Sequence, residues 1–568
     1  MRQVHWTGHP FVDAGLAALA AAVDIRELGD LSPSHLKRAV QALKRVLLSD
    51  QAMGVGVGKS FVGGPMSQLF PNSELVNPSN RRGKDEREKV ENVRRKFSDA
   101  LEQDLERAER CLSGPGELIC AFCGRECSKD SAIAARKDKM PLLEGIVNFY
   151  PAFAYGVTVC GVCALAVRFL PLSVMRTGVR NRLWFLHTQV LPISASIAKC
   201  YGWDHFNDAI ARNEAVDFYN RWETAGDAGT VLYLLCELLE KMGGQIRSIY
   251  LESFPTTAYI FSNDNRDSFV QALSIPHELL TFLARLQVRS QSAFRRFRGE
   301  LFHLSADLDK ETHKRRIGFV QSVADRILRG ESVIGSSLVD DPQKLLGGWL
   351  GHGLYLHEVR KMSATKLDIL ERLGLTLAQS EDAKKRVQEL SSAKAHQLYG
   401  IFLGYVRAGW LTHKEYYTLL PPNRGESASE LRDILLGIAY EWERCQEEGG
   451  EFPRLELHVH PPSPDDTLQR IQAIGERLLQ STLNHSRWVG QLQTARTSAR
   501  IRGAYLAAVQ RRAMGFSDFV FLAPLEDARR LWLLRDYLLA FLFERLGEVP
   551  EEEIAVGGEE EADLSNIS

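Results

Sequence analysis

Two pairs of cysteines constrain the fold of this chain more than any other feature of its sequence. Cys120 and Cys123 form the first C-x-x-C pair, Cys160 and Cys163 form the second, and 36 residues lie between the pairs. Each C-x-x-C turn places two thiolates on one side of a tight loop, and two such loops close a tetrahedral shell that suits zinc. Since four protein ligands leave no open coordination position, we expect a structural Zn²⁺ site and not a catalytic one.

Two other interpretations of these cysteines remain open. The thiols can be buried and free with a chance spacing, or they can form a redox pair, although the flanking sequence shows no thioredoxin-like context. Cys127 fits the ligand spacing less well than the four paired residues. The remaining cysteines lie in largely apolar helical contexts, where we expect packing residues: Cys111, Cys200, Cys236 and Cys445.

Charge divides the chain into a basic body and an acidic end. The 568 residues include 70 Lys and Arg against 72 Asp and Glu, which gives a formal net charge of −2. Segment 548–568 carries eight acids and no base, so the rest of the chain carries +6. We expect this segment to be disordered, because it has almost no large apolar residue to bury. The overall composition excludes whole-chain disorder, collagen-like repeats and coiled-coil arrays.

The expected compartment is the cytoplasm. The first residues lack the basic and apolar regions of a secretory signal, and no window holds about 18 uncharged apolar residues. We therefore expect no membrane partner. Cytosolic thiols stay reduced, which favours metal binding over disulfides for the paired cysteines.

The pattern of elements favours an α+β fold that is predominantly helical. At roughly 150 residues per domain the length suggests about four domains. We expect a zinc-knuckle insert in the N-terminal half and a helical bundle at the C-terminal end. The expected parts are an N-terminal region over 1–115 with a Gly/Asn-rich loop at 54–80, the insert over 116–170, a mixed α/β part over 171–375, the bundle over 376–547 and the acidic tail over 548–568.

Hydrophobic periodicity predicts individual helices and strands. Helices are expected over 33–48, 84–111 and 231–242, the last ending at Gly243-Gly244, and strands over 246–254 and 258–261. The predicted helices of the bundle cover 380–418, 426–447, 465–484, 486–512 and 525–546.

Catalytic motifs are missing from the sequence. The segment GVGVGKS at 54–60 resembles a phosphate-binding loop, but Met53 stands where that motif needs a glycine. No zinc-protease, nucleophile-elbow or kinase pattern is present. We therefore expect a protein that is not an enzyme, in which Lys59 contacts a nucleic-acid backbone.

Arginines gather in separate stretches that suit contact with phosphates. Residues 81–96 carry a net charge of +4, and Arg81 and Arg82 end the Gly/Asn-rich loop. Residues 285–316 carry +5, and the run FRRFR interleaves aromatic side chains with Arg295, Arg296 and Arg298, which suits base stacking. Residues 485–513 contain no acid, and Arg496, Arg500 and Arg502 are expected to follow a phosphate backbone along one helix.

Three segments of the first 170 residues resemble a known family. They are WTGHPFVDAG at 6–15, PNSELVNPSN at 71–80 and the two C-x-x-C pairs, which are similar to the CXXC–CXXC large subunit of the type I-B CRISPR Cascade complex. The resemblance implies a non-catalytic subunit that binds the crRNA 5′ handle, recognises the protospacer-adjacent motif in duplex DNA and promotes R-loop formation. It places the C-terminal bundle along the displaced strand.

The resemblance also implies partners. These are the Cascade backbone and handle-binding subunits, and either a helicase–nuclease or a transposition factor as the downstream effector. Asn side chains can read or wedge base edges, so we expect the loop residues near the motif duplex or the crRNA handle: Lys59, Asn72, Asn77, Arg81 and Arg82.

Two rival functions come from other classes. A zinc-ribbon nuclease would need a carboxylate–lysine metal site, which the sequence does not reveal. A scaffold acting only through protein contacts would carry no RNA in its purified complex.

Overall fold

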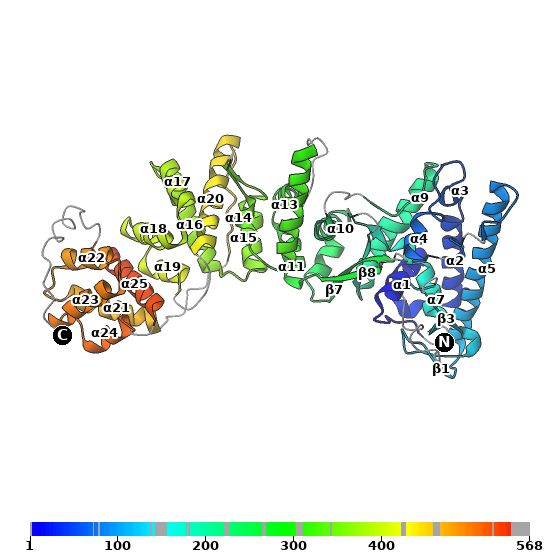
Figure 1. Ribbon diagram of the computed structural model, residues 1–568, viewed down its shortest axis with the longest axis horizontal. Coiled ribbons are helices and arrows are strands. Elements are labelled where there is room, and N and C mark those ends of the chain that lie inside the picture. Colours follow the sequence, from blue (N-terminus) through cyan, green and yellow to red (C-terminus); the bar gives the residue numbers. More distant parts are fainter. Residues whose placement is uncertain are drawn as a thin grey trace. The chain divides into compact units, whose positions relative to one another are not determined.

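The computed structural model describes residues 3–546, apart from 72, 78–79, 137–138, 143–155, 178, 180–181, 221–225, 264–267, 303–309, 341–342, 422–427, 458–465 and 525–526. Two expectations, the role of Asn72 and the disorder of 548–568, therefore fall outside the described residues. The described chain is predominantly helical with small antiparallel sheets, which confirms the predicted α+β class (Figure 1).

The described residues form two compact units. The first comprises the chain up to Gln291 together with Arg298–Glu331, and the second comprises Ser292–Phe297 and the chain from Ser332 onward. The finer division of the chain at residues 115, 170 and 375 stays a prediction.

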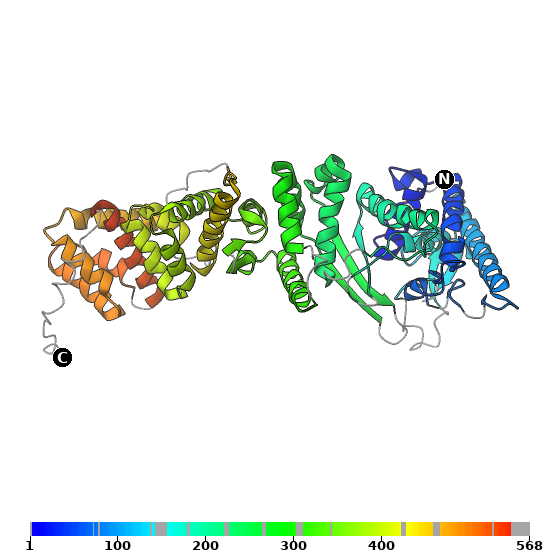
Figure 2. The same cartoon turned by 90° about the horizontal axis from the view of Figure 1, so that it is seen from above.

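Helix α1 (Pro10–Val23) forms the centre of the first unit. Its residues from Phe11 to Ala20 are all buried, because its sequence is apolar on every face. Gly15 allows close packing, since a Cβ there would lie 2.1 Å from the backbone oxygen of Ala166. Helix α2 (Pro33–Leu47) begins after Ser32, whose side chain accepts a hydrogen bond from the His35 N–H, and it packs beside the long helix α5 (Glu86–Ser113) (Figure 2).

The Gly/Asn-rich loop packs against the rest of the first unit. Between α3 (Asp50–Met53) and α5 its described residues form turns and the short helix α4 (Pro65–Leu69). Phe61 is fully buried, and its ring lies 5.1 Å from that of Phe206 and 5.0 Å from that of Phe218. Buried aromatic contacts of this kind fix the course of a segment whose glycines and prolines give it little regular structure.

The described residues of the cysteine-bearing segment include four short strands, a 3-10 turn at Lys129–Ser131 and one α-helix. Two antiparallel pairs are formed by β1 (Leu118–Ile119) with β2 (Glu126–Cys127) and by β3 (Ala132–Ala135) with β4 (Val157–Cys160). Helix α7 (Gly161–Arg168) follows β4 directly and packs against α5 and α1.

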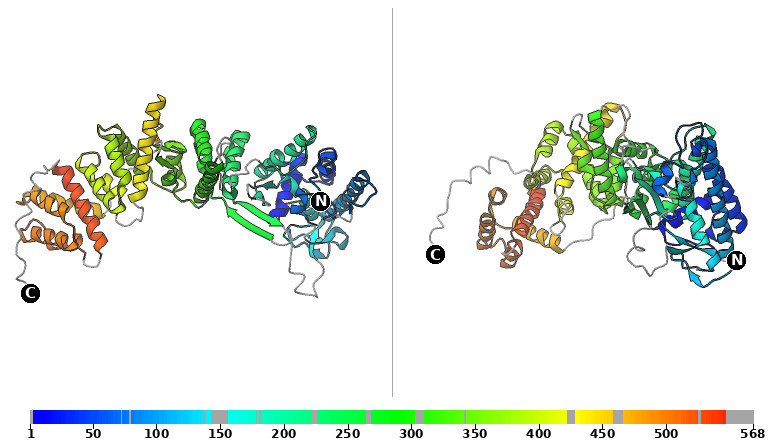
Figure 3. Two further views of the ribbon diagram at one scale, coloured as in Figure 1. Left: turned by 45° about the horizontal axis from the view of Figure 1, so that its top comes forward. Right: turned by 45° about the vertical axis from the view of Figure 1, so that its right-hand side comes forward.

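A four-stranded antiparallel sheet forms the other part of the first unit. Its order is β5 (Met175–Arg176), β6 (Leu183–Thr188), β7 (Thr256–Asn263) and β8 (Ser268–Ser274), and the long strands β7 and β8 lie side by side (Figure 3). The strand predicted at 258–261 is confirmed within β7. The helices in this part of the chain are α8 (Leu191–Ile197), α9 (Asp204–Ala211), α10 (Gly226–Tyr250), α11 (His277–Arg289), α12 (Gln291–Phe302) and α13 (Lys310–Leu328). Residues Ser292–Phe297 of α12 belong to the second unit.

The strand predicted at 246–254 is wrong. Gly243 interrupts α10 with φ 54° and ψ −127°, but the chain resumes helical geometry and continues to Tyr250. Ile246 and Tyr250 are both buried, one helical turn apart, so tertiary packing favours a helix over the local strand propensity.

In its described residues the second unit is a set of helices with one small strand pair, β9 (Leu338–Asp340) and β10 (Gln343–Leu345). Helix α16 (Ala364–Gln379) runs across residue 375 and packs against α20 (Ala428–Glu448). The helices of this unit are α14 (Ile334–Ser337), α15 (Gly348–Glu358), α16 (Ala364–Gln379), α17 (Ala383–Ser392), α18 (Ala395–Arg407), α19 (His413–Leu419), α20 (Ala428–Glu448), α21 (Asp466–Leu479), α22 (His485–Thr494), α23 (Ser498–Gln510), α24 (Phe516–Leu522) and α25 (Ala528–Leu546).

The predicted bundle is helical, but two of its expected helices are divided. Segment 380–418 forms three helices, and segment 486–512 forms α22 and α23. The second break occurs because the Thr497 side chain accepts a hydrogen bond from the backbone N–H of Arg500 at 3.3 Å and so caps a new helix.

Candidate metal centre and basic surfaces

The four paired cysteines converge on one point in the first unit. Their Sγ atoms all lie within 4.8 Å of one another, and those of Cys123 and Cys160 are 3.7 Å apart. Four sulfurs at about 2.3 Å from one zinc ion would be about 3.8 Å apart, so the cluster fits a tetrahedral metal ion. It is the only cluster of potential metal ligands found among the residues that the structure describes.

The first pair of cysteines lies on the turn between β1 and β2. The backbone N–H of Cys120 donates to the Arg125 oxygen at 2.9 Å, and that of Gly124 donates to the Cys120 oxygen at 3.0 Å. Gly124 has φ +66°, a left-handed conformation that favours glycine. This turn brings the thiols of Cys120 and Cys123 to the same side of the hairpin.

The second pair lies where β4 passes into α7. Cys160 is the N-cap of α7 and Cys163 follows in its first turn, so the positive end of the helix dipole faces the sulfurs. A Cβ on Gly161 would lie 2.3 Å from the backbone carbon of Arg107 on α5. The glycine in this pair therefore permits close packing of α7 on α5, and its φ lies outside the left-handed region.

Hydrogen bonds between the thiols give the clustered cysteines different pKa values. They lower the pKa of Cys120, with Cys123 as the leading partner. They raise the pKa of Cys160, with Cys111 as the leading partner, and that of Cys163, with Cys120 as the leading partner. A thiolate is the form of cysteine that binds metals, and the shared hydrogen bonds stabilise it at Cys120. Burial raises the pKa of Cys127 to about 11, and this residue lies outside the four-sulfur cluster.

Arg125 supplies a buried positive charge next to the cysteines. Its Nη2 donates to the Gln3 oxygen at 2.8 Å, whereas Nε and Nη1 are buried without a hydrogen-bond partner. A hydrogen bond with Cys160 and the charge of Arg125 lower the pKa of Cys111. Four thiolates around a divalent metal leave a net negative charge, which a buried guanidinium offsets. No pattern in the sequence predicts a buried charge at Arg125.

The N-terminal segment 6–15 packs against the first cysteine pair. The Asp13 carboxylate closes its loop by accepting hydrogen bonds from the N–H and hydroxyl of Thr7 and from the N–H of Gly8. His187 Nε2 on β6 lies 3.0 Å from Asp13 Oδ2. The ring centroid of His9 lies 4.3 Å from that of Phe122, a residue between Cys120 and Cys123. Burial of the imidazole lowers the pKa of His9.

A buried ion network joins the Gly/Asn-rich loop to α7. Arg168 at the end of α7 contacts Asp104 on α5 at 2.9 Å and Glu74 of the loop at 2.9 Å. Lys139 contacts Glu74 at 2.5 Å. Despite burial, these two cations hold the pKa of Glu74 well below its usual range. The cysteine centre and the loop are therefore rigidly connected through Arg168.

Two of the predicted loop residues line one cavity. Lys59 and Arg81 border a space of about 600 Å³ together with Asp217, whose carboxylate pairs with Arg176 at 3.0 Å. Arg81 lies over Gly63, where a Cβ would be 2.4 Å from its Nη2. Arg82 is exposed outside this cavity, and Asn77 is half-buried with its backbone N–H bonded to the Ser73 oxygen.

The stretch around FRRFR differs from the sequence expectation. Phe294 and Phe297 are buried in the protein, so the expected base stacking by these two rings is wrong. Arg296 Nη1 contacts Glu441 at 2.6 Å, and Arg298 pairs with Glu240. Both arginines thus serve in intramolecular ion pairs, whereas the side chain of Arg295 is exposed.

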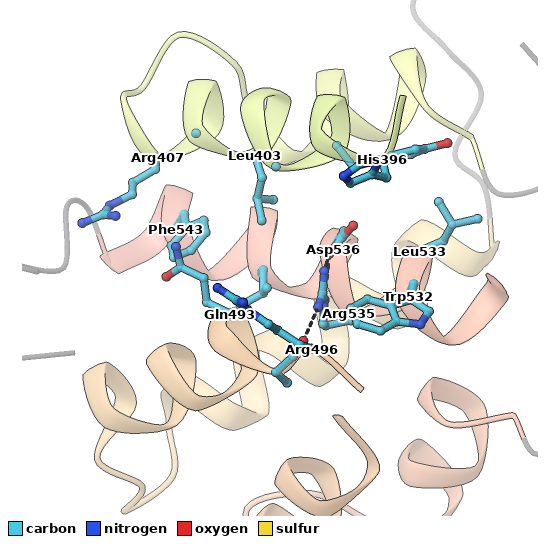
Figure 4. A pocket seen from close by; sticks show the side chains of 15 residues that line it. His396, Leu403, Arg407, Gln493, Arg496, Trp532, Leu533, Arg535, Asp536 and Phe543 are labelled. Atoms are coloured by element: carbon cyan, nitrogen blue, oxygen red, sulfur yellow. Dashed lines mark hydrogen bonds and ion pairs between the residues drawn. The ribbon is translucent and has the colours of Figure 1, made fainter. Parts of the chain in front are cut away.

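The arginines of residues 485–513 also differ from the sequence expectation, which placed them along one helix. Arg496 lies in the break between α22 and α23, so the expectation that Arg496 and Arg500 occupy successive turns of one helix is wrong. Arg500 is exposed, whereas Arg502 Nη2 donates to the Pro524 oxygen at 3.0 Å. Arg496 instead borders a cavity between α18 and α25 (Figure 4).

Comparisons with protein families, with curated proteins and with solved structures reveal no match to this chain. None of the helices in the described part of the chain has an apolar stretch sufficient to cross a lipid bilayer.

Proposed function

We propose that this chain is the non-catalytic large subunit of a crRNA-guided type I-B Cascade complex, and that its four clustered cysteines hold a structural zinc ion. In this role it binds the crRNA 5′ handle and the protospacer-adjacent motif in duplex DNA, and it promotes R-loop formation. It acts in the cytoplasm with the Cascade backbone and handle-binding subunits. It helps to recruit a helicase–nuclease or, in a transposon-associated system, a transposition factor.

The proposal rests on one observation about the first unit. The first segment that carries the resemblance contacts the first cysteine pair directly, and the second segment contacts the helix that carries Cys163. His9 of the first segment packs on Phe122 beside the cysteines, and Glu74 of the second pairs with Arg168 at the end of the helix that carries Cys163. Segments distant in the sequence thus form one body, as expected if they share a function.

The cavity of Lys59 and Arg81 is the best candidate for contact with nucleic acid in this body. Lys59 is exposed, and neither cation has an ion-pair partner among the described residues. Cations with available donors bind phosphate oxygens and release counterions, which gives affinity. The cavity adjoins Gly63 and Gly64, and the lack of a side chain at Gly63 gives the Arg81 guanidinium its place at the border of the cavity.

The test is binding of labelled duplex DNA, with and without the cognate motif, by the assembled complex with its crRNA. Alanine at all five loop residues (Lys59, Asn72, Asn77, Arg81 and Arg82) is expected to reduce the affinity ratio between the two DNAs by about tenfold or more, because a good contact to a base edge contributes about 1–3 kcal/mol of discrimination.

A matched control replaces exposed cations on α2. Arg38→Ala with Arg45→Ala should leave the affinity ratio unchanged, since these residues lie outside the Gly/Asn-rich loop and outside every predicted phosphate-contact stretch. If the five-alanine variant keeps the affinity ratio between the two DNAs unchanged, the loop does not recognise the motif. Nuclease activity of the isolated chain would instead favour the rival zinc-ribbon nuclease.

A further inference from the structure

A cavity in the second unit is lined by cationic and aromatic side chains. It has a volume of about 750 Å³ and lies between α18 and α25, with the end of α22 at its border (Figure 4). We call it the α18–α25 groove. Arg407, Arg496 and Arg535 supply positive charge, while Trp532, Leu539 and Phe543 supply apolar surface.

The three arginines of the α18–α25 groove differ in how they are held. Arg535 is fixed: its Nη1 donates to the Ala495 oxygen at 3.1 Å, its Nη2 pairs with Asp536 at 2.5 Å, and it lies over the Trp532 ring. Arg496 is exposed and has no acidic partner among the described residues. With Asp536 as the one acid among the lining residues, the groove has an excess of positive charge.

Two glycines of α18 keep the α18–α25 groove open. Gly400 and Gly404 lie one helical turn apart and both line it. A Cβ at either position would meet nothing within 4 Å, so larger side chains would project into free space. The wall of the groove is therefore bare backbone over one turn, which leaves room for an extended chain.

The C-terminal segment 547–568 has the opposite character. It contains eight acids and no base, in two clusters at Glu548–Glu553 and Glu559–Asp563, with Ile554, Ala555 and Val556 between them. It leaves α25 three residues beyond Phe543, which lines the groove. At about 3.3 Å per residue its 22 residues reach up to about 70 Å, far more than the roughly 17 Å that α25 rises from Trp532 to Phe543.

We infer that the acidic C-terminal segment of this chain docks in the α18–α25 groove. Its two acidic clusters meet Arg407 and Arg496, and its short apolar stretch packs against Leu539 and Phe543. The segment lies in the groove as an internal polyanion, so any other anionic ligand of this unit must displace it. This inference is independent of the proposed function.

The test is photo-crosslinking in the full chain, with p-benzoylphenylalanine in place of Ile554. Mass spectrometry is expected to find crosslinks to peptides of α18 or α25 at low ionic strength, and their yield should fall in 0.5 M NaCl because salt screens exposed charges. Arg407→Glu with Arg496→Glu should lower the yield by about fivefold or more, and lysines in place of Glu551, Glu552 and Glu553 should restore it.

Two further variants separate docking from a general attraction of charges. Gly400→Leu with Gly404→Leu fills the α18–α25 groove without a charge change and should also lower the yield. Arg500→Glu with Arg511→Glu changes the charge equally outside the groove and should not. Thermal melting checks that each variant is folded. The inference would be overturned if the crosslinks were confined to other elements or formed between two copies of the chain. It would also be overturned if the crosslink yield stayed the same in both the Arg407→Glu, Arg496→Glu variant and the Gly400→Leu, Gly404→Leu variant.

Discussion

Arg168 illustrates how one residue can hold several segments together. Its side chain is 8% exposed and is neutralised by Asp104 from α5 and Glu74 from the Gly/Asn-rich loop. A buried guanidinium without partners would be costly, so the network requires both carboxylates. The loop is therefore positioned by a charge contact as well as by the buried ring of Phe61.

The first prediction concerns the pH dependence of this network. The pKa of Glu74 lies well below that of an unfolded glutamate, because Arg168 and Lys139 stabilise the carboxylate. Its contribution to the free energy of unfolding is complete above pH 4.5 or so, and is lost as the pH falls toward the folded pKa. Glu74→Gln should thus cost about 1–3 kcal/mol at pH 7 and progressively less in acid, measured by urea unfolding across pH.

Its control is a glutamate in an exposed pair on α5. Glu106 contacts Arg110 at 3.4 Å and both side chains are largely exposed. Glu106→Gln should change the unfolding free energy by less than about 0.5 kcal/mol at every pH. A Glu74→Gln cost that is the same at pH 3 and pH 7 would contradict the assigned direction of the pKa.

At the level of elements, the strands of the cysteine-bearing segment are too short to be stable without a crosslink. Strands β1 and β2 have two residues each, which is too short for a hairpin to be stable alone. The four sulfurs join this hairpin to the β4–α7 junction, and α7 in turn packs on α1 and α5. A bound metal ion would supply the folding free energy that the short strands lack.

The second prediction is the metal content of the purified chain. Elemental analysis should find about one zinc ion per chain, and Cys120→Ser with Cys123→Ser should abolish it and lower stability. Cys127→Ser is the matched control, since Cys127 is buried nearby but is not one of the four clustered residues. Retention of zinc by the double variant, or its loss from the control, would show that another ligand set binds the metal.

At the scale of the molecule, two compact units imply two unfolding transitions. The cysteine centre lies wholly within the first unit, and none of its ligands comes from the second. Removal of a metal from this centre should therefore act on the first unit alone, because separately packed units transmit little stability to each other.

The third prediction uses this separation. A strong zinc chelator should lower the melting temperature of the first unit by about 5 °C or more and leave that of the second unchanged. Calorimetry gives the two transitions, and hydrogen exchange with mass spectrometry assigns them to α5 and α20 respectively. The chelator should have no effect on the Cys120→Ser, Cys123→Ser variant. A common shift of both transitions would mean that the two units unfold as one.

Several features could be predicted because their signals are local. The C-x-x-C spacing determines which sulfurs can share a metal, the Ser32 cap and apolar spacing determine α2, and periodicity gives the predominantly helical class. The clustering of Cys120, Cys123, Cys160 and Cys163 could therefore be predicted from the sequence alone.

Tertiary structure decided the features that depend on partners far away in the chain. Ile246–Tyr250 is helical because its buried side chains face a core that the local sequence does not specify. Arg296 and Arg298 pair with Glu441 and Glu240, although their sequence context resembles that of a nucleic-acid contact. Composition determines how many charges a chain carries, but folding determines which of them are neutralised, because a buried charge requires a partner and an exposed one does not.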